Sequence, residues 1–271
     1  MYHVQQPVVD LCRAIQSHKG DDVFTDVLEP WLNDHPEEAA WPAEFAARTE
    51  DDWTVADDVD LCRLYSLYRA TTLLTLPFQD GREKGCDWPG PAVSSEGFLL
   101  FHEAIGIRPP ESTPDFHPFF HEIVAVRQAT DDAAPPRVVE ERWPALMLGD
   151  LLFARAGCVV EAGRDHLVKE IAETSTLYWT YRRKGRPCDD QSHGWGGNSQ
   201  WRTAHRRDYL RGGRYHFNVD GDQPLDSLAE GADDTPPAQR LEVLRHRCRV
   251  RLEKVSRWDL YPYKYTHAEA A

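Results

Sequence analysis

The sequence predicts a mainly α-helical protein that forms a single domain with one small β-hairpin element. Several segments repeat apolar residues at the three- and four-residue spacing of a helix face, and each is bounded by a proline, a glycine or a capping residue. Short segments flank a glycine turn at Arg211-Gly212-Gly213. The length of 271 residues favours one domain over 1–271, with residues 1–60 as an N-terminal arm or short helices and residues 61–271 as a helical core.

The helices of the first half of the chain have clear boundary signals. The first 60 residues are acidic and contain several prolines and short apolar groups, which is typical of short helices or a packed arm. A helix is predicted from Asp58 to Leu76, and Pro77 stops it. Its apolar face comprises Leu61, Leu64, Tyr65, Tyr68 and Thr72. Ser94 or Ser95 caps a second helix that ends before Gly106.

The middle of the chain is also predicted to be helical. A third helix is expected from Pro118 to about Gln128, and a fourth from Pro144 through Arg155, ended by Gly157. Asp165 caps a long helix that is expected to extend to Tyr178. The short run Cys158–Glu161 is interpreted as a lone strand.

The last third of the chain contains the hairpin and one more helix. The segments Trp201–Tyr209 and Tyr215–Val219 are expected to pair about the glycine turn. Pro236 starts a final helix whose apolar positions continue to Val255, and a tail rich in tyrosine and proline closes the chain. The sequence contains no internal repeat and no low-complexity tract.

The composition restricts the classes of protein that fit. A formal net charge of −14 disfavours nucleic acid and anionic membranes as partners. A run of about 18 apolar residues is missing, which argues against a membrane span, and the N-terminus lacks the features of a secretory signal. The six cysteines are scattered without a Cys-x-x-Cys pair, as expected for free thiols in a reducing cytosol. A cytoplasmic protein is therefore expected.

The segment Ser192–Thr203 has the highest density of ligand-binding residue types. His193 is followed by Gly194, Gly196 and Gly197, and glycine lets the backbone approach a flat or charged ligand. Nine basic residues against three acidic ones lie between Arg182 and Arg214, which favours an anionic group on that ligand. The alternative is a structural turn tied by its own polar side chains, with the arginines solvated or in salt bridges.

The polar and aromatic residues of this region suggest an amino acid as the ligand. Asn198, Ser199 and Arg202 can bind an α-carboxylate and ammonium through charge-assisted hydrogen bonds. Four large rings are expected to form an aromatic wall: Tyr178, Trp179, Trp195 and Trp201.

Three further histidines are candidate catalytic residues. His102 lies among apolar residues of a predicted helix, where it either faces a pocket as a neutral base or is a core histidine bonded to a carbonyl. His117 and His121 are four residues apart, which places both on one face of the predicted third helix, with Glu122 adjacent. Such a pair could bind zinc or non-haem iron, although His117 could instead only cap the helix.

Four segments resemble the haem-dependent L-tyrosine hydroxylases of antibiotic pathways. They are Phe116–Val124, Leu146–Phe153, Ser175–Trp179 and the loop Ser192–Thr203. That family is mainly helical, is related to the tryptophan-dioxygenase type and binds haem b non-covalently through one histidine. It uses hydrogen peroxide to convert L-tyrosine to L-DOPA.

The resemblance implies roles for individual residues. His193 looks like the proximal iron ligand, with His205 or His216 as the fallback, and His102 looks like a distal histidine. His117 and His121 are grouped with His102 as catalytic candidates. Arginines able to meet the haem propionates are Arg182, Arg183 and Arg206. The substrate contacts are expected to be Asn198, Trp201, Arg202 and Tyr178.

The sequence thus leads to one principal hypothesis and two competitors. The principal hypothesis is haem-dependent hydroxylation of an aromatic amino acid, with a small-molecule partner and a homodimer left open. The first competitor is a non-haem metal enzyme that uses His102, His117, His121 and Glu122. The second is a non-catalytic binding or immunity protein in which the loop docks a partner.

Overall fold

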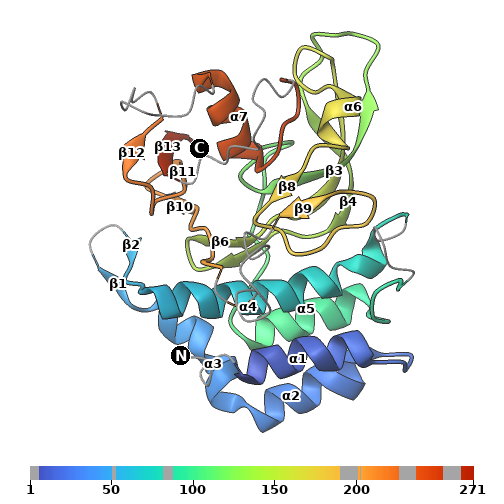
Figure 1. Cartoon of the computed structure of the whole chain (residues 1–271), viewed down its shortest axis with the longest axis vertical. Helices are drawn as coiled ribbons and strands as arrows, with labels where there is room; N and C mark the ends of the chain where they lie inside the picture. The colour runs from blue at the N-terminus through green and yellow to red at the C-terminus, as the bar shows by residue number, and fades with distance from the viewer. Residues whose placement is uncertain are drawn as a thin grey trace. The chain divides into compact units, whose positions relative to one another are not determined.

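A computed structural model of the chain describes residues 6–50, 53–81, 88–189, 201, 203–225, 236–252 and 264–271. It divides into two compact units (Figure 1). Unit 1 comprises Met1–Pro110, Leu146–Gly149 and Trp179–His205. Unit 2 comprises Glu111–Ala145, Asp150–Tyr178 and Arg206–Ala271.

The mainly α-helical prediction is wrong. The chain contains 36% helix and 23% strand, with mixed sheets, and is therefore an α/β protein. The error arises mostly in unit 2, which contains a strand that is buried on both faces. Residues Ala156–Val160 of one strand are all buried, and such a strand reads as a continuous apolar run without the alternation that would identify it.

Unit 1 contains the helices of the N-terminal part of the chain, as predicted for residues 1–60 and for the two helices that follow. Figure 1 shows α1, α2, α4 and α5 lying side by side. The helical elements are α1 (Gln6–Ser17), η2 (Phe24–Leu28), α2 (Glu29–Asp34), α3 (Pro36–Ala46), α4 (Asp58–Leu74), η3 (Leu76–Phe78) and α5 (Ser95–Ala104). The strands of this unit are β1 (Thr49–Glu50), β2 (Trp53–Thr54), β5 (Leu146–Leu148) and β9 (Cys188–Asp189).

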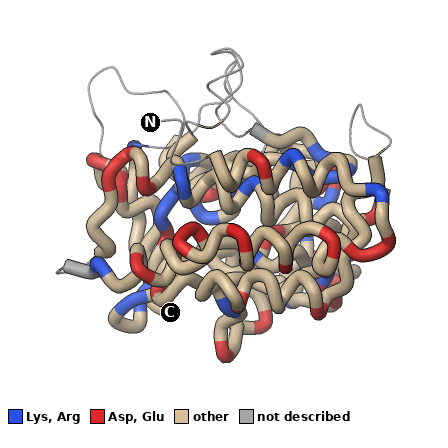
Figure 2. Tube along the Cα trace, turned by 90° about the horizontal axis from the view of Figure 1, so that it is seen from below, with Lys and Arg blue, Asp and Glu red and all other residues tan. Residues whose placement is uncertain are grey.

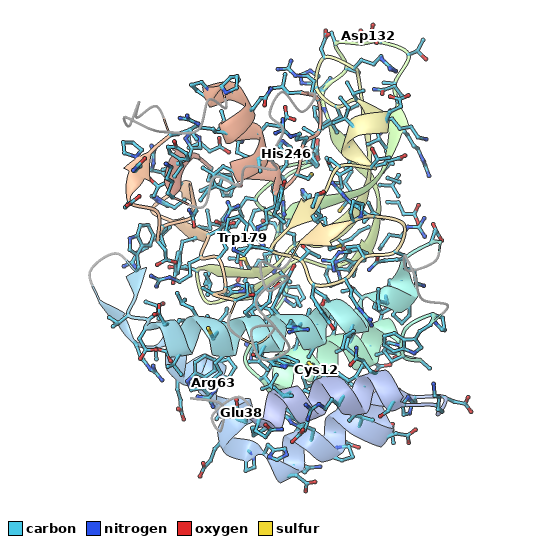
Figure 3. All side chains as sticks on the ribbon, in the orientation of Figure 1. Cys12, Glu38, Arg63, Asp132, Trp179 and His246 are labelled. Atoms are coloured by element: carbon cyan, nitrogen blue, oxygen red, sulfur yellow. The ribbon has the colours of Figure 1, made fainter. Side chains whose placement is uncertain are left out.

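Helix α4 is the central element of unit 1, because its residues are buried continuously from Leu64 to Leu74. Its start is fixed by a capping box in which Asp57 accepts from the amide of Asp60 at 2.8 Å and Asp60 accepts in return from the amide of Asp57 at 3.3 Å. The Nε of Arg63 on α4 donates to Glu38 of α3 at 2.8 Å (Figure 3). The predicted cap of α5 is confirmed, since Ser94 Oγ accepts from the amide of Gly97.

Unit 2 contains two mixed sheets. In the first, β3 (His121–Gln128) runs parallel to β7 (Ala156–Ala162), and β4 (Arg137–Trp143) runs antiparallel to β7. The second contains strands in the order β12-β13-β11-β10-β6. Their bounds are β6 (Leu151–Ala154), β10 (Tyr209–Arg211), β11 (Arg214–Phe217), β12 (Gln223–Pro224) and β13 (Tyr265–Ala270). The remaining elements of the unit are α6 (Lys169–Ala172), β8 (Leu177–Tyr178) and α7 (Pro237–His246).

Three predicted helices of the middle region are corrected by the structure. The segment Pro118–Gln128 is a turn followed by β3, and the segment from Pro144 to Arg155 forms β5 and β6 around Gly149, whose φ is 58°. The expected long helix from Asp165 to Tyr178 is reduced to the four residues of α6. In the first two segments, buried strands carry apolar residues at spacings that also fit a helix, and tertiary pairing decides.

The predictions for the C-terminal third hold better. A hairpin of β10 and β11 forms about the predicted turn, with Gly212 and Gly213 at φ values of 59° and 69°. Its first strand is Tyr209–Arg211 and not the predicted Trp201–Tyr209. The final helix is present as α7 but ends at His246, because Arg247 adopts the left-handed conformation with a φ of 56°. Acidic and basic positions are interspersed along the described trace (Figure 2). Within the described part of the chain, every helix is too short or too polar to cross a membrane.

Gly157 is a structural glycine of β7 and does not end a helix as predicted. A Cβ atom at this position would overlap the indole of Trp143, whose Nε1 donates to the carbonyl of Arg155 at 2.9 Å. We therefore expect Gly157→Ala to lower the free energy of unfolding by about 1–3 kcal/mol, the usual cost of overpacking. Trp143→Phe removes the overlapping atoms, so the loss caused by Gly157→Ala should shrink in the double variant. Urea denaturation of the four proteins in this cycle measures the coupling, and strictly additive losses would contradict the explanation.

A candidate histidine–glutamate site

The antiparallel pair β11 and β13 of unit 2 presents one face with four functional side chains. Tyr215 lies opposite Glu269, and Phe217 lies opposite His267. Directly opposed residues of an antiparallel pair project from the same face, and alternate residues along one strand share a face. Two aromatic rings therefore lie beside a histidine and a carboxylate.

The turn that precedes β3 covers this face. His117 stacks on Tyr215 with ring centroids 4.0 Å apart, and Phe119 contacts the same ring at 4.9 Å. The carbonyl of His117 accepts from the amides of Phe120 and His121 at 3.1 and 3.0 Å, which holds the turn. The His117 Nε2 consequently lies 3.0 Å from Oε1 of Glu269.

The carboxylate of Glu269 is the centre of the site. Besides His117, the Nε of Arg245 at the end of α7 contacts Oε1 at 3.1 Å, and Nε2 of His267 contacts Oε2 at 3.3 Å. Burial alone would raise the pKa of Glu269. The hydrogen bonds from His117 and His267 and the charge of Arg245 outweigh burial and lower the pKa to about 2. Glu269 is therefore ionised at neutral pH.

The two histidines on this carboxylate differ in the nitrogen that remains. Nδ1 of His117 accepts from the amide of Phe119 at 3.2 Å, so both of its nitrogens are engaged. Nδ1 of His267 has no hydrogen-bond partner among the described residues, and the side chain is 25% exposed. His267 is thus the imidazole of this pair that can exchange a proton with a bound molecule.

Two further imidazoles lie beside the carboxylate site. Nδ1 of His121 accepts from the amide of His117 at 2.9 Å. The ring of Phe116 stacks with His121 at 5.7 Å and with His246 at 6.3 Å, with interplanar angles of 21° and 19°. Burial is the main cause that lowers the pKa of His121 to about 4 and the pKa of His246 well below its usual value. Both imidazoles are neutral at pH 7.

The structure brings together only part of the predicted catalytic set. His117 and His121 are neighbours as predicted, but they belong to a turn and the first residue of β3 and not to a helix. Glu122 lies on the opposite face of β3 from His121, because successive strand residues alternate. His102 lies in unit 1, where Nε2 pairs with Thr71 Oγ1 at 2.9 Å and Nδ1 with the carbonyl of Phe98 at 2.7 Å. Burial lowers the pKa of His102 to about 4.

The predicted cofactor and substrate residues are distributed over both units. In unit 1, the Arg182 guanidinium lies 5.8 Å from the ring centroid of Trp88 and 5.5 Å from that of Tyr181, and Arg183 is buried. Trp201 also lies in unit 1, where its ring contacts the guanidinium of Arg69. Arg69 was not among the residues predicted from the sequence. In unit 2, Tyr178 is buried and its amide donates to the carbonyl of Arg247 at 2.8 Å.

Arg206 has a structural environment in unit 2. Its Nε donates to Asp208 Oδ1 at 2.8 Å, and the other carboxylate oxygen accepts from Arg247 at 3.0 Å. His193, Asn198 and Arg202, together with most of the loop Ser192–Thr203, lie outside the described residues.

The metal-binding prediction is wrong for the described part of the chain, which contains no group of three or more histidine, cysteine or acidic residues able to hold a metal ion. The Nε2 atoms of His117 and His267 instead form hydrogen bonds with the carboxylate of Glu269. The histidines predicted from the sequence as iron ligands or distal groups have the following surroundings where the structure describes them. Both nitrogens of His102 are engaged, His205 is buried edge-on against Tyr68, and His216 has other contacts.

The sequence reasoning missed Arg245, His246, His267 and Glu269. The signal that could have found the tail residues is the alternation of Tyr265, His267 and Glu269 with small or polar residues, as in a half-buried strand. Arg245 and His246 occupy the last turn of α7, a position that basic residues commonly take. We found no matching protein-family model, curated protein or solved structure for this chain.

The buried neutral histidines predict a specific pH dependence of stability. His121 titrates near 6.5 in the unfolded chain but at about 4 in the folded one, so the unfolded state binds more protons between these values. The free energy of unfolding should therefore fall as the pH falls from about 6.5 to about 4. Glu269, with its lowered pKa, loses its contribution only below its unfolded value of about 4.3.

The matching experiment is urea denaturation at several pH values between 7 and 4.5, with hydrogen exchange to follow the amides of β3. His121→Asn keeps an acceptor near the position of Nδ1 and removes the titration, so the fall should become shallower. The control is His166→Asn, which removes an exposed histidine of the same unit. Equal slopes for His121→Asn and the wild type would contradict the explanation.

Proposed function

We propose that this chain is an acid–base enzyme in which His267 transfers the reacting proton. The observation that supports the proposal best is the carboxylate of Glu269, which binds His267, His117 and Arg245 at once. A carboxylate that holds one nitrogen of a histidine fixes the ring and its tautomer, and it stabilises the imidazolium that forms on proton uptake. The other nitrogen then faces the reactants.

The geometry divides the roles among the residues of the site. Nε2 of His267 donates to Glu269, which leaves Nδ1 as the proton acceptor. His117 and Arg245 position Glu269 from the turn before β3 and from the end of α7. His117 is therefore a positioning residue in this proposal. His121 holds His117 in place, because its Nδ1 accepts a hydrogen bond from the backbone amide of His117.

The chemistry that fits this arrangement best is the activation of water. Among the described residues, none of the recorded hydrogen bonds of His267 or Glu269 involves a serine, threonine or cysteine that could act as a nucleophile. The side chain of His267 is partly exposed, so water can reach Nδ1. The imidazole takes a proton from water as the oxygen attacks an electrophilic centre, and the resulting imidazolium returns the proton to the leaving group. The proposed reaction is hydrolysis.

A graded set of variants tests this proposal. His267→Gln keeps a donor near the position of Nε2 and removes Nδ1, so hydrolysis found in a screen of phosphate and carboxylic esters should fall by about 10²–10⁴-fold. Glu269→Gln should cause a comparable loss of kcat and change the pH profile. His117→Gln keeps the donor to Glu269 and should have a much smaller effect. His166→Asn is the control, and unchanged hydrolysis in His267→Gln would refute the proposal.

Haem-dependent hydroxylation of an aromatic amino acid is the second proposal, because part of its predicted environment is aromatic and cationic. The Arg69 guanidinium lies 3.8 Å from the ring centroid of Tyr181 and 4.0 Å from that of Trp201. All three residues belong to unit 1, and Tyr181 and Trp201 lie on either side of the segment that contains His193 in the sequence. The mixed α/β composition differs from the mainly helical fold that the resemblance implies.

Titration of the purified protein with hemin tests the second proposal directly. Histidine-ligated ferric haem is expected to give a Soret band at about 400 nm that saturates at one hemin per chain. His193→Ala should abolish this band while the far-ultraviolet circular dichroism stays unchanged. A colourless wild-type protein, or a His193→Ala variant that binds haem normally, would exclude His193 as the proximal ligand.

A further inference from the structure

The imidazole of His246 lies next to the proposed acid–base site, and the described residues offer no hydrogen-bond partner to one of its nitrogens. His246 is the last residue of α7 (Figure 3), and its Nδ1 is buried without a hydrogen-bond partner among the described residues. Buried polar atoms are nearly always paired, so an unpaired one in a candidate site points to a missing partner.

The ring of His246 is held in place, and its Nδ1 does not reach a polar group of the described residues. One face stacks against Phe116 at 6.3 Å with an interplanar angle of 19°. The carbonyl of the same residue accepts from Nη1 of Arg155 at 2.9 Å, which fixes the backbone below the ring. The partner of Nδ1 is therefore expected to come from a bound molecule.

The charges that face His246 indicate the sign of that molecule. After burial, the neighbours that act on its pKa are Arg245, Arg155 and His117, which lower it, and Glu269, which opposes them. The negative charge of Glu269 is already bound by His117, His267 and Arg245. The electrostatic environment of His246 is positive, which favours an anion.

Arg245 supplies the second contact that an anion needs. Its Nε binds Glu269, whereas its two terminal nitrogens have no hydrogen-bond partner among the described residues, and the side chain is 30% exposed. A guanidinium fork of this kind binds carboxylate and phosphate oxygens. Arg245 and His246 are adjacent in the last turn of α7, so one short segment carries both donors.

We propose that the substrate of the acid–base site carries an oxyanion, a carboxylate or a phosphate, that is bound by the Arg245 guanidinium and by Nδ1–H of His246. The role of this group as part of a substrate rests on the proposed hydrolytic function, but its binding does not. The anion anchors the molecule beside Glu269, and His267 on the same carboxylate then faces the bond to be broken.

The test is histidine side-chain NMR of the full-length ¹⁵N-labelled chain, titrated separately with inorganic phosphate and with acetate at constant ionic strength. The ring nitrogens of His246 should shift and saturate with at least one of the two anions. His246→Ala and Arg245→Gln should each weaken binding at least tenfold, whereas His246→Asn, which places an amide near the position of Nδ1, should restore most of it.

His18 of unit 1 is the matched control, because its Nδ1 is also buried without a partner among the described residues. Shifts that do not saturate, or that are equal at His18 and His246, would overturn the proposal. Binding unaffected by His246→Ala would overturn it as well. His267→Gln separates the two proposals. If anion binding is saturable and His267→Gln hydrolyses esters as well as the wild type does, only the catalytic role of His267 is refuted. If His267→Gln loses hydrolysis but the wild type binds neither anion, only the anion site is refuted.

Discussion

The carboxylate of Glu269 is the interaction on which the candidate site of unit 2 depends. It joins three segments that are far apart in the sequence, namely the turn at His117, the end of α7 at Arg245 and the strand β13 itself. A half-buried carboxylate is stable there only because each oxygen receives a donor and a positive charge lies close by. The same contacts orient both histidines, so the electrostatic requirement of one residue determines the geometry of the site.

A second buried carboxylate determines where α7 ends, and this places Arg245 and His246. Asp208 accepts from Arg206, from Arg247 and from the amide of Asn218 at 2.7 Å. Burial raises the pKa of Asp208, but the charges of Arg206 and Arg247 outweigh it and hold the pKa below its usual value. Because Arg247 is drawn to this carboxylate with a left-handed backbone, the helix terminates one residue earlier. The predicted continuation of α7 to Val255 is stopped by this ion group.

The sequence was sufficient where local signals and tertiary structure agree. The capping residue Ser94 and the Gly212-Gly213 turn both act within a few residues, and each predicted the correct element. It was insufficient in unit 2, where strands such as β7 are buried by pairing with partners distant in the chain. Gly157 shows the difference well. The sequence predicts that it ends a helix, yet in the structure its lack of a side chain leaves room for the indole of Trp143.

The candidate site was half predictable for the same reason. The spacing of His117 and His121 correctly indicated that the two imidazoles lie close together, but four residues also span a turn in which one histidine accepts the backbone amide of the other. That hydrogen bond competes with helix formation, as local side-chain to backbone bonds generally do. Once the turn forms, His121 enters β3 and His117 is free to stack on Tyr215. His267 and Glu269 complete the site only through the register of β11 and β13, which a single sequence without pairing information does not specify.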